Sequence, residues 1–157
     1  MKEFDAHGIR FRYPSTWTLS DDSGEDKIAV TVQSEGSTFW TVAVFPDAPR
    51  PERVIESAVT AYREDYPDLD VYPIETRTES RGTVLSRDLE YVCVELIAAA
   101  RIEAFHAGNS TVMVLFQGAD AELESRRPVL DAMTASLEMA ESDDEPIWPG
   151  SEDLLPG

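Results

Sequence analysis

Several residue types are scarce in this sequence, and each scarcity excludes something. The 157 residues include one cysteine, Cys93, so no disulfide can form within the chain. The two histidines, His7 and His106, have no partner at the spacing of a metal site. Basic residues are few: 13 Lys and Arg stand against 31 Asp and Glu, a net charge of −18. This charge disfavours nucleic acid and anionic membranes as partners and would attract a basic protein or a cation. We expect a protein partner, and a basic one is compatible with this charge.

Long apolar runs are also missing. A membrane helix needs about 20 apolar residues, whereas the longest candidate run, residues 92–100, is short and contains Glu95. The opening residues, MKEFDAHGIRFRYP, lack the apolar core of a secretory signal. From these absences we expect a cytoplasmic protein that binds neither membranes nor nucleic acid.

Motifs that carry catalysis are absent as well. The chain contains no G-x-S-x-G, G-x-x-x-x-G-K or G-x-G-x-x-G pattern. Cys93 lies in the apolar segment EYVCVEL, where a thiol behaves as a small, inert hydrophobe. The many carboxylates fall mainly in polar segments, which indicates a solvated surface, although an acid/base pair of the glycosidase kind stays open. We therefore expect no enzyme, no catalytic residue, no metal-binding residue and no cofactor.

Alternation of apolar and polar residues predicts a series of β-strands. Two of them, residues 39–45 and 111–117, are apolar on both alternating sides, which is typical of strands in the middle of a covered sheet. Pro73 indicates an edge strand, because proline cannot donate a ladder hydrogen bond. The predicted strands are residues 4–7, 9–13, 28–33, 39–45, 71–76, 83–96, 97–106 and 111–117.

Two segments have helical spacing of apolar residues. Residues 51–66 begin with a proline, which suits a first helical turn. Asp120 predicts the cap of a second helix, and Pro128 predicts a break followed by a helix over residues 128–139. Strands and helices in this order predict an α+β fold: an antiparallel sheet of about six to seven strands with helices on both faces.

The stretch FRYPSTWTL, residues 11–19, is the most distinctive in the chain. Pro14 ends the strand before it, and Trp17 can then cover the end of the sheet. This element and three others, in this order, resemble the PsbP-like superfamily, which includes the photosystem II protein PsbP, a Ran-binding nuclear import factor and bacterial DcrB-type proteins. The four elements are residues 11–19, the helix 51–66, the hairpin 97–117 and the final helical segment 133–139.

The resemblance spans roughly residues 4–139 and implies an α/β/α sandwich. It also implies that the protein works by binding other proteins, because members of the superfamily share no catalytic set. We accordingly expect one PsbP-like domain over residues 1–139 and an acidic, Pro/Gly-rich tail over residues 140–157.

The tail contains the sequence EPIWPG, in which Ile147 and Trp148 lie between prolines. An exposed indole has no packing partner, so this pair either folds back onto the domain or docks onto a partner, and it is our sequence-based candidate for a partner-binding site. The function that we expect is a non-catalytic protein-interaction or adaptor module. The alternative is a small-molecule binding protein or minor enzyme with a pocket between sheet and helix.

Overall fold

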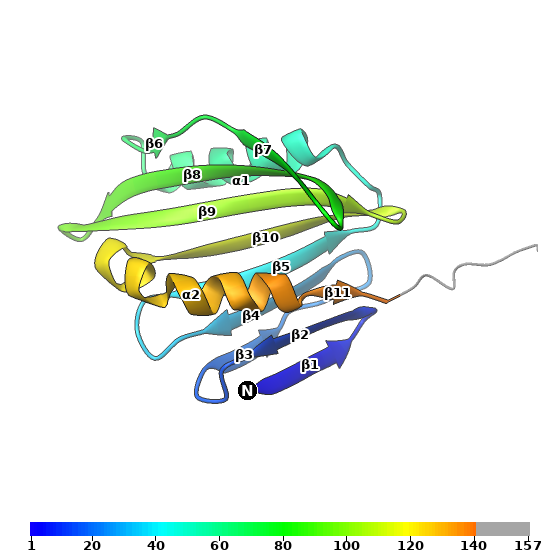
Figure 1. Cartoon of the computed structure of the whole chain (residues 1–157). Helices are drawn as coiled ribbons and strands as arrows, with labels where there is room; N and C mark the ends of the chain where they lie inside the picture. Colours follow the sequence, from blue (N-terminus) through cyan, green and yellow to red (C-terminus); the bar gives the residue numbers. More distant parts are fainter. Residues whose placement is uncertain (141–157) are drawn as a thin grey trace, which may run out of the picture.

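A large antiparallel sheet forms the centre of the molecule, as Figure 1 shows for the computed structural model, which describes residues 1–140. In these residues its strands lie in the order β3-β4-β5-β10-β9-β8-β6, and β7 also pairs with β8. A second, three-stranded sheet has the order β1-β2-β11. The strands are β1 (Lys2–Ala6), β2 (Ile9–Tyr13), β3 (Thr18–Asp21), β4 (Ile28–Gln33), β5 (Phe39–Phe45), β6 (Asp70–Val71), β7 (Glu75–Glu79), β8 (Gly82–Cys93), β9 (Leu96–Ala107), β10 (Ser110–Ala119) and β11 (Glu138–Met139).

Two helices cover opposite faces of the large sheet. Helix α1 (Pro51–Asp65) and helix α2 (Asp120–Ser136) contribute to two separate apolar clusters. Strand β10 lies between them: Val112 and Val114 join the cluster of α2, whereas Met113 and Leu115 join that of α1. Strand β5 is the neighbour of β10 at mid-sheet, and the apolar clusters of the two helices lie on opposite faces of these strands. The predicted α+β fold with helices on both faces is confirmed.

The strand count exceeds the prediction of six to seven. The large sheet has eight strands in the described residues, because the predicted edge strand 71–76 is divided into β6 and β7. Pro73 lies in the gap between the two strands, where its missing N–H costs no ladder bond. The adjacent Tyr72 N–H still donates to the Asp88 carbonyl, with an N–O distance of 3.0 Å, and keeps this edge in place.

The predicted break at Pro128 is wrong. Helix α2 runs without interruption from Asp120 to Ser136 with Pro128 inside it. Pro128 is on the exposed side, so the carbonyl that loses its donor can be hydrated, while Leu123 and Leu130 hold both halves of the helix on the sheet. The helix also ends before residue 139, because Glu138–Met139 form β11 and pair with β2. Asp120 is its first residue and makes no capping bond.

The stretch that predicted the fold behaves as expected. The Trp17 N–H donates to the Pro14 carbonyl at 3.1 Å, which turns the chain directly after β2. Trp17 is 6% exposed and belongs to the apolar cluster under α2. Phe11 packs against Trp40 in the same cluster, with ring centroids 4.8 Å apart. The proline turn therefore delivers a large apolar side chain to the core.

Glu122, near the start of α2, fastens the loop between β4 and β5. Its carboxylate accepts hydrogen bonds from the backbone N–H groups of Ser37 and Thr38 at 2.9 and 3.1 Å. The Ser34 and Ser37 hydroxyls add bonds of 3.2 and 3.0 Å. Burial alone would raise the pKa of Glu122, but these hydrogen bonds outweigh it and lower the pKa to about 2.

Candidate protein-interaction surface

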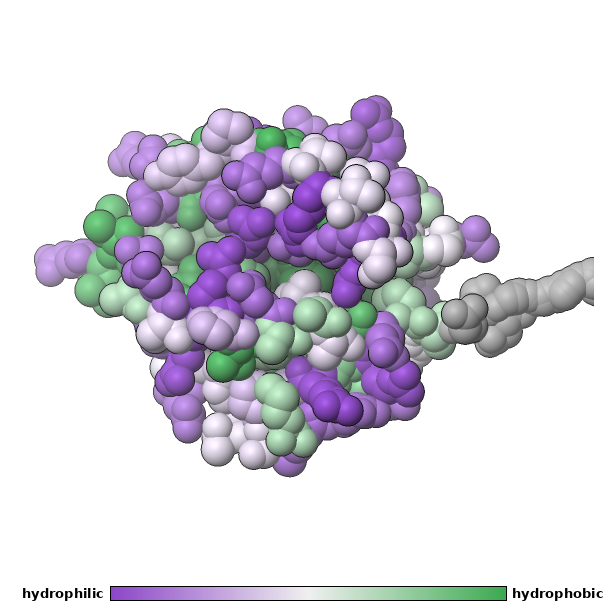
Figure 2. Space-filling model, in the orientation of Figure 1, coloured by the Kyte–Doolittle hydropathy of each residue, from purple (hydrophilic) through white to green (hydrophobic). Residues whose placement is uncertain are grey.

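The β8–β9 hairpin carries the main exposed apolar surface on the described part of the chain. It projects from one end of the sheet, at the left in Figure 1, and Figure 2 shows a hydrophobic patch at the same place. We call its four aliphatic side chains the apolar tip, and their exposed fractions range from 54% to 88%. The apolar tip consists of Val92 (66%), Val94 (88%), Leu96 (62%) and Ile97 (54%).

The turn of this hairpin is strained. Cys93 pairs with Leu96, so Val94 and Glu95 alone connect the strands. Both have positive φ angles, 49° and 67°, the left-handed region that favours glycine and asparagine. The strain is of the order of 1–2 kcal/mol per residue. Val94 recovers none of it by packing, because its side chain is almost fully exposed.

The contrast with the β1–β2 turn is informative. His7 and Gly8 form the equivalent two-residue connection, with φ angles of 57° and 80°. There the second residue is glycine, and the first is a residue type that tolerates this region better than valine does. The β8–β9 turn therefore contains residues that this backbone conformation disfavours, although the β1–β2 turn of the same protein contains better-suited ones.

An acidic pocket of about 400 Å³ lies directly beside the apolar tip. Its lining includes four carboxylates and the rings of two tyrosines, and two side chains of the tip, Val92 and Ile97, form part of its wall. No Lys or Arg is among the lining residues. The carboxylates and tyrosines of this acidic pocket are Asp65, Asp68, Asp70, Glu90, Tyr66 and Tyr91.

The end of α1 and its connection to β6 bring these carboxylates together. Pro67 follows the helix, and the chain then turns through a hydrogen bond from the Leu69 N–H to the Tyr66 carbonyl, at 3.0 Å. Strand β6 next places Asp70 opposite Glu90 of β8. The C-terminal end of α1 adds the negative end of the helix dipole to the charge of Asp65. The pocket is therefore strongly negative.

The two tyrosines form an uncharged wall of the acidic pocket. The rings of Tyr66 and Tyr91 are stacked with centroids 4.2 Å apart. Burial is the main factor that raises the pKa of Tyr91, to about 12. A hydrogen bond from its hydroxyl to the Cys93 sulfur, at 3.6 Å, is the main factor that raises the pKa of Tyr66. Both rings are neutral at physiological pH, and Tyr66 is the more exposed of the two, since Tyr91 is only 5% exposed.

The outer edge of β8 is open next to this pocket. Strand β6 pairs with β8 only at Leu89 and Glu90, and the Tyr72 N–H adds one bond to the Asp88 carbonyl. Backbone groups that point to one side of a strand recur every two residues. The N–H and C=O of Val92 therefore point outward beyond β6, where none of the described strands pairs with them.

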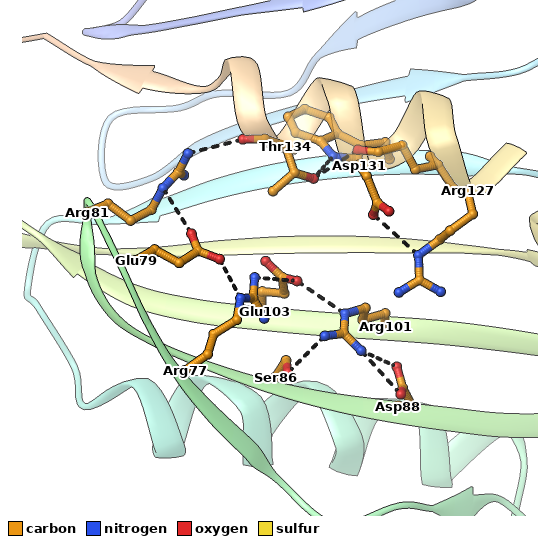
Figure 3. A network of polar contacts seen from close by, with 12 residues as sticks. Arg77, Glu79, Arg81, Ser86, Asp88, Arg101, Glu103, Arg127, Asp131 and Thr134 are labelled. Carbon is orange, nitrogen blue, oxygen red and sulfur yellow. Dashed lines mark hydrogen bonds and ion pairs between the residues drawn. The ribbon is translucent and has the colours of Figure 1, made fainter.

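A second feature, the charged groove, lies between α2 and strands β7 to β9 (Figure 3). Two cavities of about 460 and 360 Å³ mark it. At its centre the Glu103 carboxylate accepts hydrogen bonds from Arg77 and Arg101, both at 3.1 Å. Arg101 also donates to both carboxylate oxygens of Asp88, at 3.0 and 3.2 Å, and to the Ser86 hydroxyl at 3.1 Å.

The charges in this groove balance one another. Four arginines and four carboxylates form ion pairs across it, so a charged ligand would have to break existing pairs to bind. The groove corresponds to the pocket between sheet and helix that the alternative hypothesis requires, but its groups satisfy each other. The paired residues are Arg77, Arg81, Arg101, Arg127, Glu79, Asp88, Glu103 and Asp131.

Known proteins match this chain in structure only. Comparisons with protein-family models and with curated proteins give no match. Cyanobacterial PsbP from Synechocystis sp. PCC 6803 superposes with a TM-score of 0.64 at 13% identity, covering 88% of this chain and 91% of that one. The Ran-binding protein Mog1p from Saccharomyces cerevisiae has a TM-score of 0.59 at 9% identity, covering 90% and 96%. A protein from Bacteroides thetaiotaomicron has a TM-score of 0.56 at 13% identity, covering 92% of this chain and 50% of that one.

The chain has the PsbP-like fold. The resemblance seen in the sequence is thereby confirmed at the level of structure. Two further findings concern the described residues, 1–140. No group of three His, Cys, Asp or Glu side chains is arranged to hold a metal ion there. None of the helices in this part of the chain is both long and apolar enough to cross a membrane.

Among the residues singled out from the sequence that the structure describes, Cys93 adjoins the apolar tip and the two histidines make their contacts elsewhere. Ile147 and Trp148 lie outside the described residues. His7 binds Asp21, with 2.7 Å between Nε2 and Oδ2, and His106 contacts the Thr111 hydroxyl at 3.3 Å. Cys93 is half-buried at the end of β8, and its sulfur accepts a hydrogen bond from the Tyr66 hydroxyl. Its thiol is therefore more exposed to solvent than the apolar segment around it indicates.

The apolar tip was missed in the sequence for a specific reason. The sequence predicts an apolar run over residues 92–100 and a boundary between the two strands after residue 96, whereas the turn lies at Val94 and Glu95. The usual signal of a two-residue turn, an Asn-Gly or Asp-Gly pair, is replaced by Val94 and Glu95. Without that signal, the exposure of these side chains cannot be read from the sequence.

Proposed function

We propose that this protein is a non-catalytic protein-interaction module that binds its partner through the apolar tip. One observation supports this most strongly: a strained turn presents Val94 to solvent between three other exposed aliphatic side chains. Contiguous exposed apolar surface is typical of protein–protein contact sites, and backbone strain concentrates at functional positions.

The fold is compatible with this role. Mog1p, which shares the fold, is described as a Ran-binding protein, so at least one protein with this architecture binds another protein. The net charge of −18 disfavours nucleic acid and anionic lipid as partners. The reducing cytoplasm is the compartment that we propose, because the sequence has a single cysteine and forms no internal disulfide.

Site-specific crosslinking in the organism that makes the protein tests this function. A photoreactive amino acid in place of Glu95 reports on the tip while it leaves all four apolar side chains intact. The same group in place of Thr83, exposed at the opposite end of β8, is the matched control. We expect one dominant crosslinked protein from position 95 and none from position 83.

A variant establishes that the contact is specific. Val92→Thr together with Leu96→Thr removes apolar surface but keeps residues that suit a strand. We expect this variant to remain folded, with an unchanged circular dichroism spectrum, and to lose the crosslinked protein. Crosslinking that persists in the folded variant, or that is equal from positions 95 and 83, would contradict the proposed function.

A further inference from the structure

We infer that the partner presents an extended, basic segment, which pairs with the open edge of β8 and places a lysine or arginine in the acidic pocket. This inference rests on the proposed function and specifies the chemistry of the partner at the same site. Three features of the described residues support it: an unpaired backbone edge, an acidic pocket lining without Lys or Arg, and the position of both beside the apolar tip.

The backbone edge at Val92 can accept an added strand. Its N–H and C=O point outward on the same side as those of Asp88 and Glu90, and β6 begins only at Asp70, opposite Glu90, so it does not extend to this level. An extended segment of another protein would continue the line of β6 and satisfy these groups. Recognition of this kind takes affinity from main-chain hydrogen bonds and specificity from side-chain pockets beside the edge.

The lining of the acidic pocket favours a cationic side chain. Asp68, Asp70 and Glu90 provide carboxylate oxygens, and the half-buried Tyr66 provides neutral aromatic surface, whereas Tyr91, stacked on it, is only 5% exposed. A guanidinium or ammonium group combines favourably with both, through charge-assisted hydrogen bonds to the carboxylates and through contact with the Tyr66 ring. The volume of about 400 Å³ is sufficient for one long basic side chain together with part of its backbone.

The position of the pocket selects the sequence around that cation. Val92 and Ile97 belong to both the acidic pocket and the apolar tip, so the two surfaces are continuous. In a strand, alternate side chains point to opposite faces. A segment that alternates aliphatic and basic residues therefore satisfies the edge, the tip and the pocket together. A second copy of this chain is disfavoured, because its net charge is also −18.

Peptide titrations followed by NMR of the full chain test the inference. The probe is the capped peptide acetyl-Val-Arg-Val-Arg-Val-amide, and its counterpart with Glu in place of Arg has the opposite charge. We expect the basic peptide to shift amide signals from Tyr91 to Ile97 and to bind more weakly at higher salt. We expect no binding of the acidic peptide. An N-methyl group on the central valine of the basic peptide is expected to abolish binding, because it removes a strand hydrogen bond.

Two double variants separate a local site from general charge. Asp68→Asn with Asp70→Asn removes two carboxylates from the pocket, and we expect affinity for the basic peptide to fall about tenfold. Glu25→Gln with Asp26→Asn changes the net charge by the same amount in an exposed loop at the opposite edge of the sheet, and we expect almost no change. Both variants are checked for a native-like spectrum before titration.

The inference is overturned if the basic peptide does not bind, if its shifts lie elsewhere, or if both double variants weaken binding equally. In those cases a crosslinked protein at position 95 that still depends on Val92 and Leu96 would leave the proposed function intact, with a partner of other chemistry. If crosslinking at position 95 also failed to depend on Val92 and Leu96, both the inference and the proposed function would be contradicted. A concentration-dependent dimer that forms through the tip would also overturn the inference.

Discussion

Replacing the β8–β9 turn by Asn-Gly should stabilise the protein and weaken partner binding at the same time. Val94→Asn with Glu95→Gly supplies the residues that this turn geometry favours. The two left-handed residues cost roughly 1–2 kcal/mol each in strain. Introducing glycine lowers the stability by about 0.5–1 kcal/mol, because glycine has greater freedom in the unfolded chain. Because asparagine recovers only part of the strain at position 94, we expect a net gain of about 1–2 kcal/mol.

Little opposes this gain. Val94 is 88% exposed, so its removal sacrifices almost no buried apolar area. For a chain of this size the gain corresponds to an increase in Tm of about 2–8 °C. Urea unfolding with an unchanged m-value measures the free energy of unfolding directly, and crosslinking from a neighbouring position of the tip measures partner binding.

The single variant Glu95→Gly is the matched control. It relaxes the backbone at one position and keeps all four apolar side chains, so we expect a smaller increase in stability with binding retained. An Asn-Gly variant that is less stable than the original chain would refute the assignment of strain. A more stable Asn-Gly variant with undiminished binding would show that Val94 is not part of the interface.

Three further predictions concern the framework that holds this surface. Glu122→Gln should cost about 1–2 kcal/mol of unfolding free energy after allowance for solvent screening. Folding lowers the pKa of Glu122 from 4.5 to about 2, so its contribution to stability is present above the unfolded pKa and is lost as pH falls from 4.5 toward 2. When urea unfolding is measured at several pH values in this range, the free energy of unfolding should therefore fall less steeply with decreasing pH in the variant than in the original chain. Arg101→Met leaves the Glu103 carboxylate, 8% exposed, with fewer partners, and calorimetry should show a loss of about 2–3 kcal/mol. Trp17→Ala should cost about 3–5 kcal/mol in urea unfolding, whereas a loss within error would contradict its role in the core.

The layered core was predictable because its pattern is local. Residues 39–45 and 111–117 alternate two apolar sets, and each set faces one helix, so neither could be an edge strand. The structure adds that these two strands are direct neighbours, β5 and β10, which the sequence pattern alone does not predict. The turn at Pro14 and the burial of Trp17 were readable for a similar reason, since a strand, a proline and an indole stand within nine residues.

What was missed depends on distant parts of the chain. Pro128 breaks an isolated helix, but contacts of Leu123 and Leu130 with the sheet hold α2 together. The short strand β11 exists only because β2, more than a hundred residues earlier, offers an edge to it. The acidic pocket combines the end of α1 with β6 and β8, and no local pattern indicates that these carboxylates meet.

The position of Ala140, the last described residue, determines how the protein can be attached to a surface. The Ala140 N–H donates to the Gly8 carbonyl at 2.7 Å, which anchors the last described residue beside the β1–β2 turn. In Figure 1 this point and the β8–β9 turn lie at opposite ends of the molecule. A biosensor surface or fluorescent reporter attached through the carboxyl end of the domain should therefore leave the hairpin facing free solution, ready to meet an analyte.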